Sequence, residues 1–164
     1  MSQNKGEQIN QLRRVLDAAG ASYAILTHDE TVTSAEEGVE KGFGDLSAMA
    51  PTLILNTEEG YVAAIISGGT RLSYKKIKKK LGLKNVSLAT PEQVQQATGA
   101  QIGAVALVNP GLRTIVDRRL TELDSVYGGC GVSRHSLQIR VKDLIAVTHA
   151  QVFDFAELKV SEKH

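Results

Sequence analysis

The chain has 164 residues, of which 42% are hydrophobic and 4% aromatic, and its formal net charge is +1. This length and hydrophobic content fit one domain with an aliphatic core, and the charge excludes a protein that is polycationic over its whole surface. The single cysteine excludes an internal disulfide, so we expect a protein of the reducing cytoplasm. No apolar run approaches the ~20 residues of a membrane span, so we expect no membrane partner. Residues 1–6 are polar, unlike a signal sequence.

The first third of the chain predicts two helices with a strand between them. Apolar residues recur at helical spacing over residues 7–19, which indicates an amphipathic helix. Residues 23–26 form an apolar run that predicts a short strand. Thr33 or Ser34 can cap a second helix that ends near residues 42–44.

The middle third predicts a hairpin followed by two short helices. Residues 52–55 and 61–66 are apolar runs separated by a polar, glycine-ended segment, which is a strong hairpin pattern. We expect a basic helix over 73–81 and a brief strand at 86–88. A Thr-Pro-Glu-Gln sequence opens another helix over 90–99.

The last third predicts mostly strands. They are expected at 102–108, 112–116, 125–127, 136–139 and 150–154, with a helix or turn at 142–147. Hairpins are prominent in this order and strand–helix–strand crossovers are few, so we predict an α+β domain with a mixed, mostly antiparallel sheet. We expect a single domain over residues 1–158, followed by a polar tail at 159–164.

A glycine-rich segment separates two of the predicted strands. Gly128, Gly129 and Gly131 fill three of four consecutive positions, which predicts a tight turn with bare backbone N–H groups that a ligand can approach closely. Two interpretations stay open, a plain glycine-rich hairpin or the wall of a pocket. Cys130 lies inside the segment; it either fills the turn or, with a base partner, acts as a nucleophile.

Asp117 ends an apolar strand, where an acidic side chain is unexpected. It can cap the following turn, receive a nearby arginine such as Arg118 or Arg119, or orient a group in a pocket. The residues leave these three alternatives open. The four histidines are widely scattered, and no phosphate-binding or dinucleotide-binding motif is present, so we expect neither a metal nor a cofactor.

Several segments, taken in order, resemble the YbaK/EbsC-type aminoacyl-tRNA deacylases, relatives of the editing domain of bacterial prolyl-tRNA synthetases. They are His28 with 33–37, Thr52–Leu55, Gly68–Leu72, Leu88–Val94, Thr98–Gly99 with Gly103, Val116–Asp117 and Gly128–Gly131. The resemblance covers nearly the whole chain. It implies a mixed, partly barrel-like sheet with peripheral helices, and it implies hydrolysis of the ester in misacylated tRNA.

The resemblance also implies which residues meet the substrate. Those that match the family's pocket positions are His28, Gly103, Asp117, Gly128, Gly129 and Gly131. The family has a lysine directly before the core strand, but here that position is Pro51, which has neither an ammonium group nor an N–H donor. Two functions therefore stay open: a trans-editing deacylase, or a catalytically inactive module that binds tRNA or a synthetase. An unrelated small-molecule pocket on the same scaffold is a third alternative.

A basic cluster in the middle of the chain supplies candidate contacts to tRNA. Seven cations fall in a short stretch without an acid between them: Arg71, Lys75, Lys76, Lys78, Lys79, Lys80 and Lys84. The cluster is either a solvated helix surface or a contact to the phosphate backbone, since a polyanion relieves the repulsion between like charges. The contact candidates are Arg71, Lys75, Lys76, Lys78 and Lys79.

Overall fold

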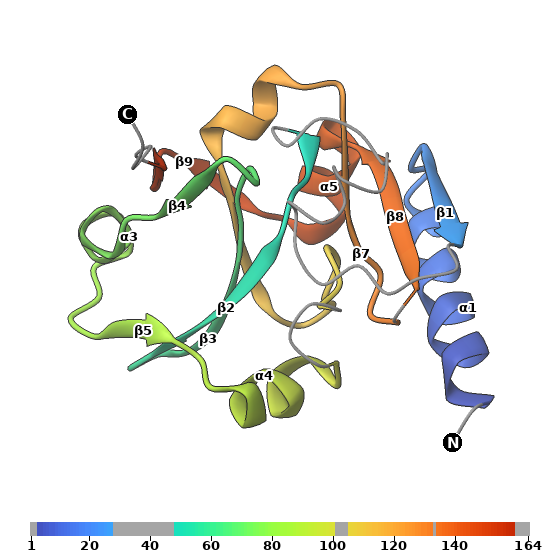
Figure 1. Ribbon diagram of the computed structural model, residues 1–164, viewed down its shortest axis with the longest axis horizontal. Helices are drawn as coiled ribbons and strands as arrows, with labels where there is room; N and C mark the ends of the chain where they lie inside the picture. The colour runs from blue at the N-terminus through green and yellow to red at the C-terminus, as the bar shows by residue number, and fades with distance from the viewer. Residues whose placement is uncertain (1–2, 28–47, 101–104, 133, 160–164) are drawn as a thin grey trace, which may run out of the picture.

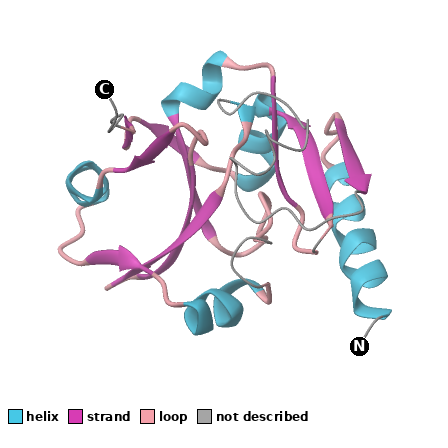
Figure 2. Cartoon of the chain, viewed as in Figure 1, coloured by secondary structure: helices cyan, strands magenta, loops and turns pink. Residues whose placement is uncertain are grey.

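The computed structural model describes residues 3–27, 48–100, 105–132 and 134–159. Its elements are α1 (Gln3–Ala18), β1 (Tyr23–Thr27), β2 (Thr52–Thr57), β3 (Gly60–Ile65), β4 (Thr70–Leu72), α3 (Tyr74–Leu81), β5 (Val86–Leu88), α4 (Pro91–Thr98), β6 (Arg113–Asp117), the 3-10 helix η2 (Arg118–Glu122), β7 (Ser125–Gly129), β8 (His135–Arg140), α5 (Val141–Thr148), β9 (Gln151–Phe153) and β10 (Ala156–Leu158). In Figures 1 and 2, α1, α3 and α4 lie at the outside of the molecule, whereas α5 is drawn near its centre.

The described strands form three open sheets. Their orders are β5-β2-β3-β6-β9, β1-β8-β7 and β10-β4. Only β3–β6 and β6–β9 are parallel pairs among the described strands, and the other five pairs are antiparallel. The predicted α+β class with a mixed, mostly antiparallel sheet is therefore confirmed. None of the described helices is long and apolar enough to cross a membrane.

Local sequence signals account for the hairpin and for two helices. The β2–β3 hairpin closes where Thr57 Oγ1 donates to the carbonyl of Gly60 at 2.7 Å. Ser73 caps α3 through the N–H of Lys76. Thr90 and Gln93 form a complete capping box at the start of α4, which satisfies helix donors that otherwise lack partners.

The five-stranded sheet separates two groups of core side chains. Successive side chains of a strand point to opposite faces, and β3 illustrates this. Ala64 packs in the same cluster as Ile77 of α3, whereas Ile65 packs in the cluster that holds Val126 of β7. The basic helix and the glycine-rich strand therefore lie on opposite faces of this sheet, as Figure 1 shows.

The sequence prediction was wrong or incomplete at several elements. The strand predicted at 102–108 does not form over its described part, residues 105–108, where only Ala106 forms an isolated bridge, to Gly129; residues 102–104 lie outside the described residues. Two three-residue strands, β4 and β10, were missed because they exist only through pairing with each other across the chain. The 3-10 helix after β6 was missed as well. The predicted helix starting at 33 or 34 lies outside the described residues.

Candidate functional site

Three distant segments meet beside the glycine-rich strand β7. Met49 pairs with Tyr127, and Ala106 pairs with Gly129. The N–H of Ala50 donates to the Tyr127 carbonyl at 2.7 Å, and the N–H of Leu107 donates to the Gly129 carbonyl at 2.9 Å. We call residues 49–52, 105–107 and 127–131 the junction. It joins the five-stranded and three-stranded sheets at the end of β7 where the glycines lie.

The glycine segment is more strand than turn, which corrects the prediction. Gly128 and Gly129 belong to β7 and pair with Leu137 and Ser136 of β8. Only Gly131 has the left-handed backbone of a turn, with φ of +91°, which favours glycine. All three glycines are half-buried, so the strand remains partly open to solvent.

Gly128 has a packing reason to be glycine. A Cβ built on it would lie 2.5 to 2.8 Å from three side-chain carbons of Leu107, a separation that real Cβ contacts do not tolerate. The absent side chain is thus explained by a protein neighbour. Gly131 has more room, because a Cβ built on it would lie 3.8 Å from the Ala106 Cβ, an ordinary contact distance.

Pro51 lies in the junction, directly before β2. Its carbonyl accepts the N–H of Ile66 at 3.2 Å, and its missing N–H falls before the first strand residue, where proline is tolerated. The residue is half-buried. The core strand therefore accommodates proline without losing a hydrogen bond between strands. The position lacks the ammonium group that a lysine would supply.

Thr52, the next residue, carries a polar atom that sequence reasoning did not single out. Its Oγ1 is inaccessible to solvent and has no hydrogen-bond partner among the described residues. Threonine is common in strands, so the residue type gave no reason to predict a site at Thr52. Its position directly after Pro51 was the one feature of the sequence that could have indicated it.

Asp117 is fully buried and anchors the chain after β9. Its Oδ1 accepts the N–H groups of Phe155 and Ala156 at 2.9 and 3.1 Å, and its Oδ2 accepts the N–H of Arg119 at 3.2 Å. The Arg119 Nη1 lies 3.7 Å from Oδ2 and donates to the Ala156 carbonyl. Of the three alternatives for Asp117, the structure supplies contacts for two, the cap of η2 and the arginine partner.

Cys130 is buried, and its sulfur lies 4.0 Å from the carbonyl oxygen of Val132. Burial raises the pKa of its thiol, because desolvation disfavours the thiolate. A buried, protonated thiol is a poor nucleophile, which favours the interpretation of Cys130 as a residue that fills the turn.

Two predicted pocket residues, His28 and Gly103, lie outside the described residues. Within the described ranges, no group of three or more His, Cys, Asp and Glu side chains is arranged to hold a metal ion. Gly128, Gly129 and Gly131 are the predicted pocket residues that the structure brings to the junction. Asp117 lies at the C-terminal end of β6, level with the start of β2 two strands away. It contacts Phe155 and Ala156, where β10 begins.

The basic cluster is partly neutralised by acidic partners. Lys76 Nζ lies 3.2 Å from Asp154, and Arg71 lies 3.6 Å from Glu157. Four other lysines of α3 have no acidic partner among the described residues: Lys75, Lys78, Lys79 and Lys80. The outer surface of α3 therefore presents net positive charge to solvent.

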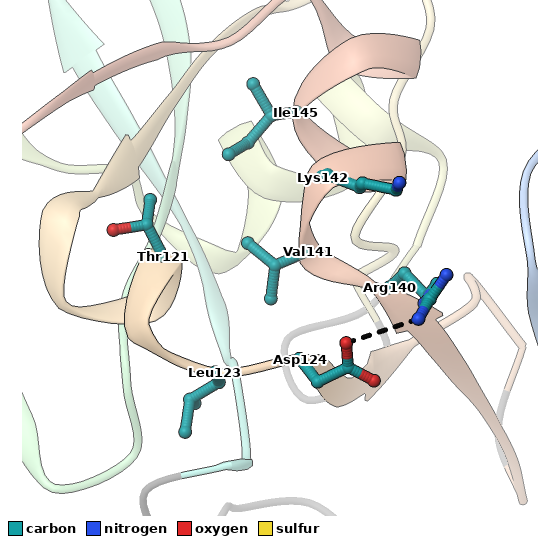
Figure 3. A pocket seen from close by; sticks show the side chains of 7 residues that line it. All are labelled: Thr121, Leu123, Asp124, Arg140, Val141, Lys142 and Ile145. Atoms are coloured by element: carbon teal, nitrogen blue, oxygen red, sulfur yellow. Dashed lines mark hydrogen bonds and ion pairs between the residues drawn. The ribbon is translucent and has the colours of Figure 1, made fainter.

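A shallow cavity of about 260 Å³ lies at the opposite end of β7 and β8 from the glycines (Figure 3). It is lined by Thr121, Leu123, Asp124, Arg140, Val141, Lys142 and Ile145. Asp124 and Arg140 form an ion pair of 3.4 Å at its rim. Gly129 is four positions along β7 from Ser125, which is roughly 13 Å. The residues that line the cavity include none of the predicted pocket residues.

Comparison with known proteins points to one family. A family model described as "Aminoacyl-tRNA editing domain" matches residues 28–147. The "Multifunctional Ser/Thr-tRNA deacylase ProXp-y" of Escherichia coli K12 is 25% identical over 159 residues, which are 92% of this chain and 95% of that protein. The proline--tRNA ligase of Thermosipho melanesiensis is 24% identical over 137 residues, 82% of this chain, but the matched part is only 23% of the ligase.

Solved structures agree with this family match. The hypothetical protein APE2540 is 28% identical, with a TM-score of 0.83 over 92% of this chain and 99% of that one. A second structure, whose description proposes a trans-editing enzyme for prolyl tRNA synthetase, is 25% identical. Its TM-score is 0.80, over 92% of this chain and 97% of that one.

Proposed function

This chain belongs to the aminoacyl-tRNA editing domain family, and on that premise we propose that it hydrolyses the ester of misacylated tRNA in trans. Water adds to the ester carbonyl, and the bond to the terminal ribose oxygen breaks. One proton of the water passes to that ribose oxygen, the other is released to solvent, and the amino acid leaves as a carboxylate. The similarity to the E. coli Ser/Thr-tRNA deacylase over 95% of that protein supports the deacylase activity. Seryl- and threonyl-tRNA are therefore the first substrates to test.

The junction carries this proposal. In it, the segment before the core strand and the segment after Val105 each form a hydrogen bond to the partly open glycine strand. These segments come from distant parts of the chain and are held together by backbone hydrogen bonds of 2.7 and 2.9 Å. A rigid arrangement of this kind suits a small pocket for the aminoacyl end.

The substrate contacts of the proposal follow from the junction. Gly129 and Gly131 form its wall, and Gly128 keeps that wall in place by packing against Leu107. We retain His28 and Gly103 as proposed substrate contacts on the family resemblance alone. Asp117 acts indirectly, by holding the segment from Phe155 onward.

Hydrolysis here cannot depend on an ammonium group at residue 51. Proline leaves that position without charge or donor. The negative charge that develops on the ester carbonyl must then be stabilised by other donors, and backbone N–H groups or hydroxyls at the junction are suited to this. A ribose hydroxyl of the tRNA itself can help to activate water.

The basic face of α3 is the proposed contact to the tRNA backbone. Because the five-stranded sheet stands between α3 and the junction, these lysines would meet the body of the tRNA and not its aminoacylated end. Phosphate contacts of this kind strengthen binding without reading sequence. A synthetase is a second candidate partner, and we propose that the chain acts in the cytoplasm as one domain over residues 1–158.

Pro51 favours a second candidate function, a module that binds tRNA or a synthetase without turnover. A panel of misacylated tRNAs separates the two functions. The deacylase proposal expects hydrolysis of at least one member well above the buffer rate at micromolar protein. Salt-dependent tRNA binding without hydrolysis of any member would instead support the binding module.

A further inference from the structure

The hydroxyl of Thr52 stands out among the buried hydroxyls of this protein. The hydroxyls of the buried residues have partners. Thr70 Oγ1 donates to the Ser67 carbonyl at 2.8 Å, and Thr114 Oγ1 donates to the Leu112 carbonyl at 3.0 Å. Ser73 accepts an N–H at the start of α3, and Ser67 accepts the N–H of Gly69 at 3.5 Å. Thr52 Oγ1 has none among the described residues, although no solvent reaches it.

Valine would serve the fold better at this position. Threonine and valine have the same branched shape and both suit strands, but a buried hydroxyl without a partner costs free energy. Unsatisfied groups of this kind in native proteins call for a specific cause, and a ligand is one.

The position of Thr52 links this hydroxyl to the junction. Thr52 is directly opposite Ile65 in the β2–β3 ladder, so both side chains lie on the same face of the sheet. Ile65 packs in the cluster that includes Ala50 and Leu107. The Thr52 side chain is therefore on the face that is covered by the 105–107 segment and β7.

We propose that the Thr52 hydroxyl is a substrate contact, which hydrogen-bonds a polar group of the aminoacylated ribose; this inference rests on the proposed editing function. A hydroxyl can both donate and accept, so its partner is the ester carbonyl, the ribose 2′-hydroxyl or the α-amino group. Thr52 is half-buried as a residue, and rotation about its Cα–Cβ bond moves the hydroxyl between staggered positions. The substrate would thus supply the partner that the free protein lacks.

The Thr52→Val variant tests the proposal through two readouts with opposite signs. We expect the melting temperature to rise by about 2 °C or more, because an unsatisfied group is removed. We expect kcat/KM for the hydrolysed aminoacyl-tRNA to fall about 2- to 10-fold, the range for one hydrogen bond. Thr52→Ser, which keeps the hydroxyl, should retain activity.

Thr114→Val is the matched control, since its hydroxyl is buried and already has a partner. It should lower the melting temperature and leave kcat/KM of the folded protein unchanged. If Thr52→Val also lowers the melting temperature, the hydroxyl has an internal partner and the proposal is overturned. A raised melting temperature with unchanged kcat/KM overturns it too, because the hydroxyl then meets no substrate.

Substrate analogues identify the group that Thr52 meets. Aminoacyl-tRNAs that lack the 2′-hydroxyl of the terminal ribose, or the α-amino group, are compared on wild type and Thr52→Val. If Thr52→Val and wild type hydrolyse one analogue with the same kcat/KM, the group missing from that analogue is the partner of Thr52. If Thr52→Val lowers kcat/KM equally on both analogues, the partner is the ester carbonyl. If the wild type hydrolyses no aminoacyl-tRNA, the editing function itself fails and this inference falls with it. Hydrolysis by wild type and variant at equal rates rejects the Thr52 contact alone.

Discussion

Gly128 and Leu107 fit against each other so closely that a Cβ on Gly128 would lie 2.5 Å from Cγ of Leu107. The two residues belong to different segments of the junction, and the N–H of Leu107 donates to the carbonyl of the next residue, Gly129. Close packing and a backbone hydrogen bond therefore fix the distance between β7 and residues 105–107. The shape of the proposed pocket depends on this contact.

Gly128→Ala should destabilise the protein by about 1 to 3 kcal/mol, the usual cost of forcing a group into a packed interior. Urea unfolding measures this. Gly6→Ala is the control, because Gly6 has no atom within 4 Å of a built Cβ and alanine is favoured in helices; its stability should be unchanged or slightly higher. Combining Gly128→Ala with Leu107→Ala should cost less than the sum of the two. A Gly128→Ala variant as stable as wild type would contradict the packing explanation.

Asp117→Asn should lower the free energy of unfolding by about 3 kcal/mol, because the side chain loses the charge and one of the two oxygens that accept backbone N–H groups. Asp124→Asn is the matched control. Its carboxylate is 80% exposed and pairs with Arg140 at the surface, so the cost should stay below about 1 kcal/mol. If Asp117→Asn keeps full stability but loses hydrolysis, Asp117 contacts the substrate and does not serve only as an anchor.

Glu58 makes stability depend on pH near the β2–β3 turn. Its carboxylate accepts the N–H groups of Lys84 and Asn85, both at 2.8 Å, and these bonds lower its pKa. The folded state therefore binds a proton more weakly than the unfolded state, so the stabilisation is complete above the unfolded pKa of about 4.3. It is lost as the pH falls through the lower folded pKa.

Glu58→Gln should thus be less stable than wild type at pH 7, and the difference should shrink below pH ~4. Thermal unfolding across pH checks this. Glu59→Gln is the control, because Glu59 contacts Arg113 at 3.5 Å on the surface and surface pairs contribute little. A Glu58→Gln deficit that stays constant down to pH 3 would argue against the carboxylate as its source.

Replacing Lys75, Lys79 and Lys80 with Gln should weaken tRNA binding and flatten its salt dependence. These lysines are exposed on α3, and each phosphate contact contributes about 0.7 to 0.9 to the slope of log K against log salt. The expected change in slope is therefore about 2 to 3. A control with Arg14, Arg118 and Lys142 changed to Gln removes the same charge from other exposed positions. Equal effects in both variants would mean that net charge, and not the α3 surface, governs binding.

The sequence predicts the structural features that are formed by residues close together in the chain. The hairpin turn before Gly60 and the Thr90–Gln93 capping box form over a few residues, so local patterns were enough to find them. The strand pair Arg71–Glu157 and the buried anchor Asp117 depend on contacts between distant segments. No local pattern specifies such contacts.

The candidate site could be predicted only in part, for the same reason. The sequence showed that Gly128 has no side chain, but the reason, Leu107, became visible only when the two segments met. The missing partner of Thr52 has no sequence signature at all. Family resemblance supplied the choice of residues, and the structure supplied their arrangement.

Hydrolysis of misacylated tRNA by the wild type and by Pro51→Lys, measured side by side, tests the editing function most directly. Seryl- and threonyl-tRNA serve as substrates, with release of the amino acid followed at micromolar protein and compared with buffer alone. We expect the wild type to hydrolyse at least one of them well above the buffer rate, with Pro51→Lys changing the rate but not creating it. Hydrolysis that occurs only in Pro51→Lys, while the wild type binds the same tRNA without turnover, would contradict the proposed deacylase.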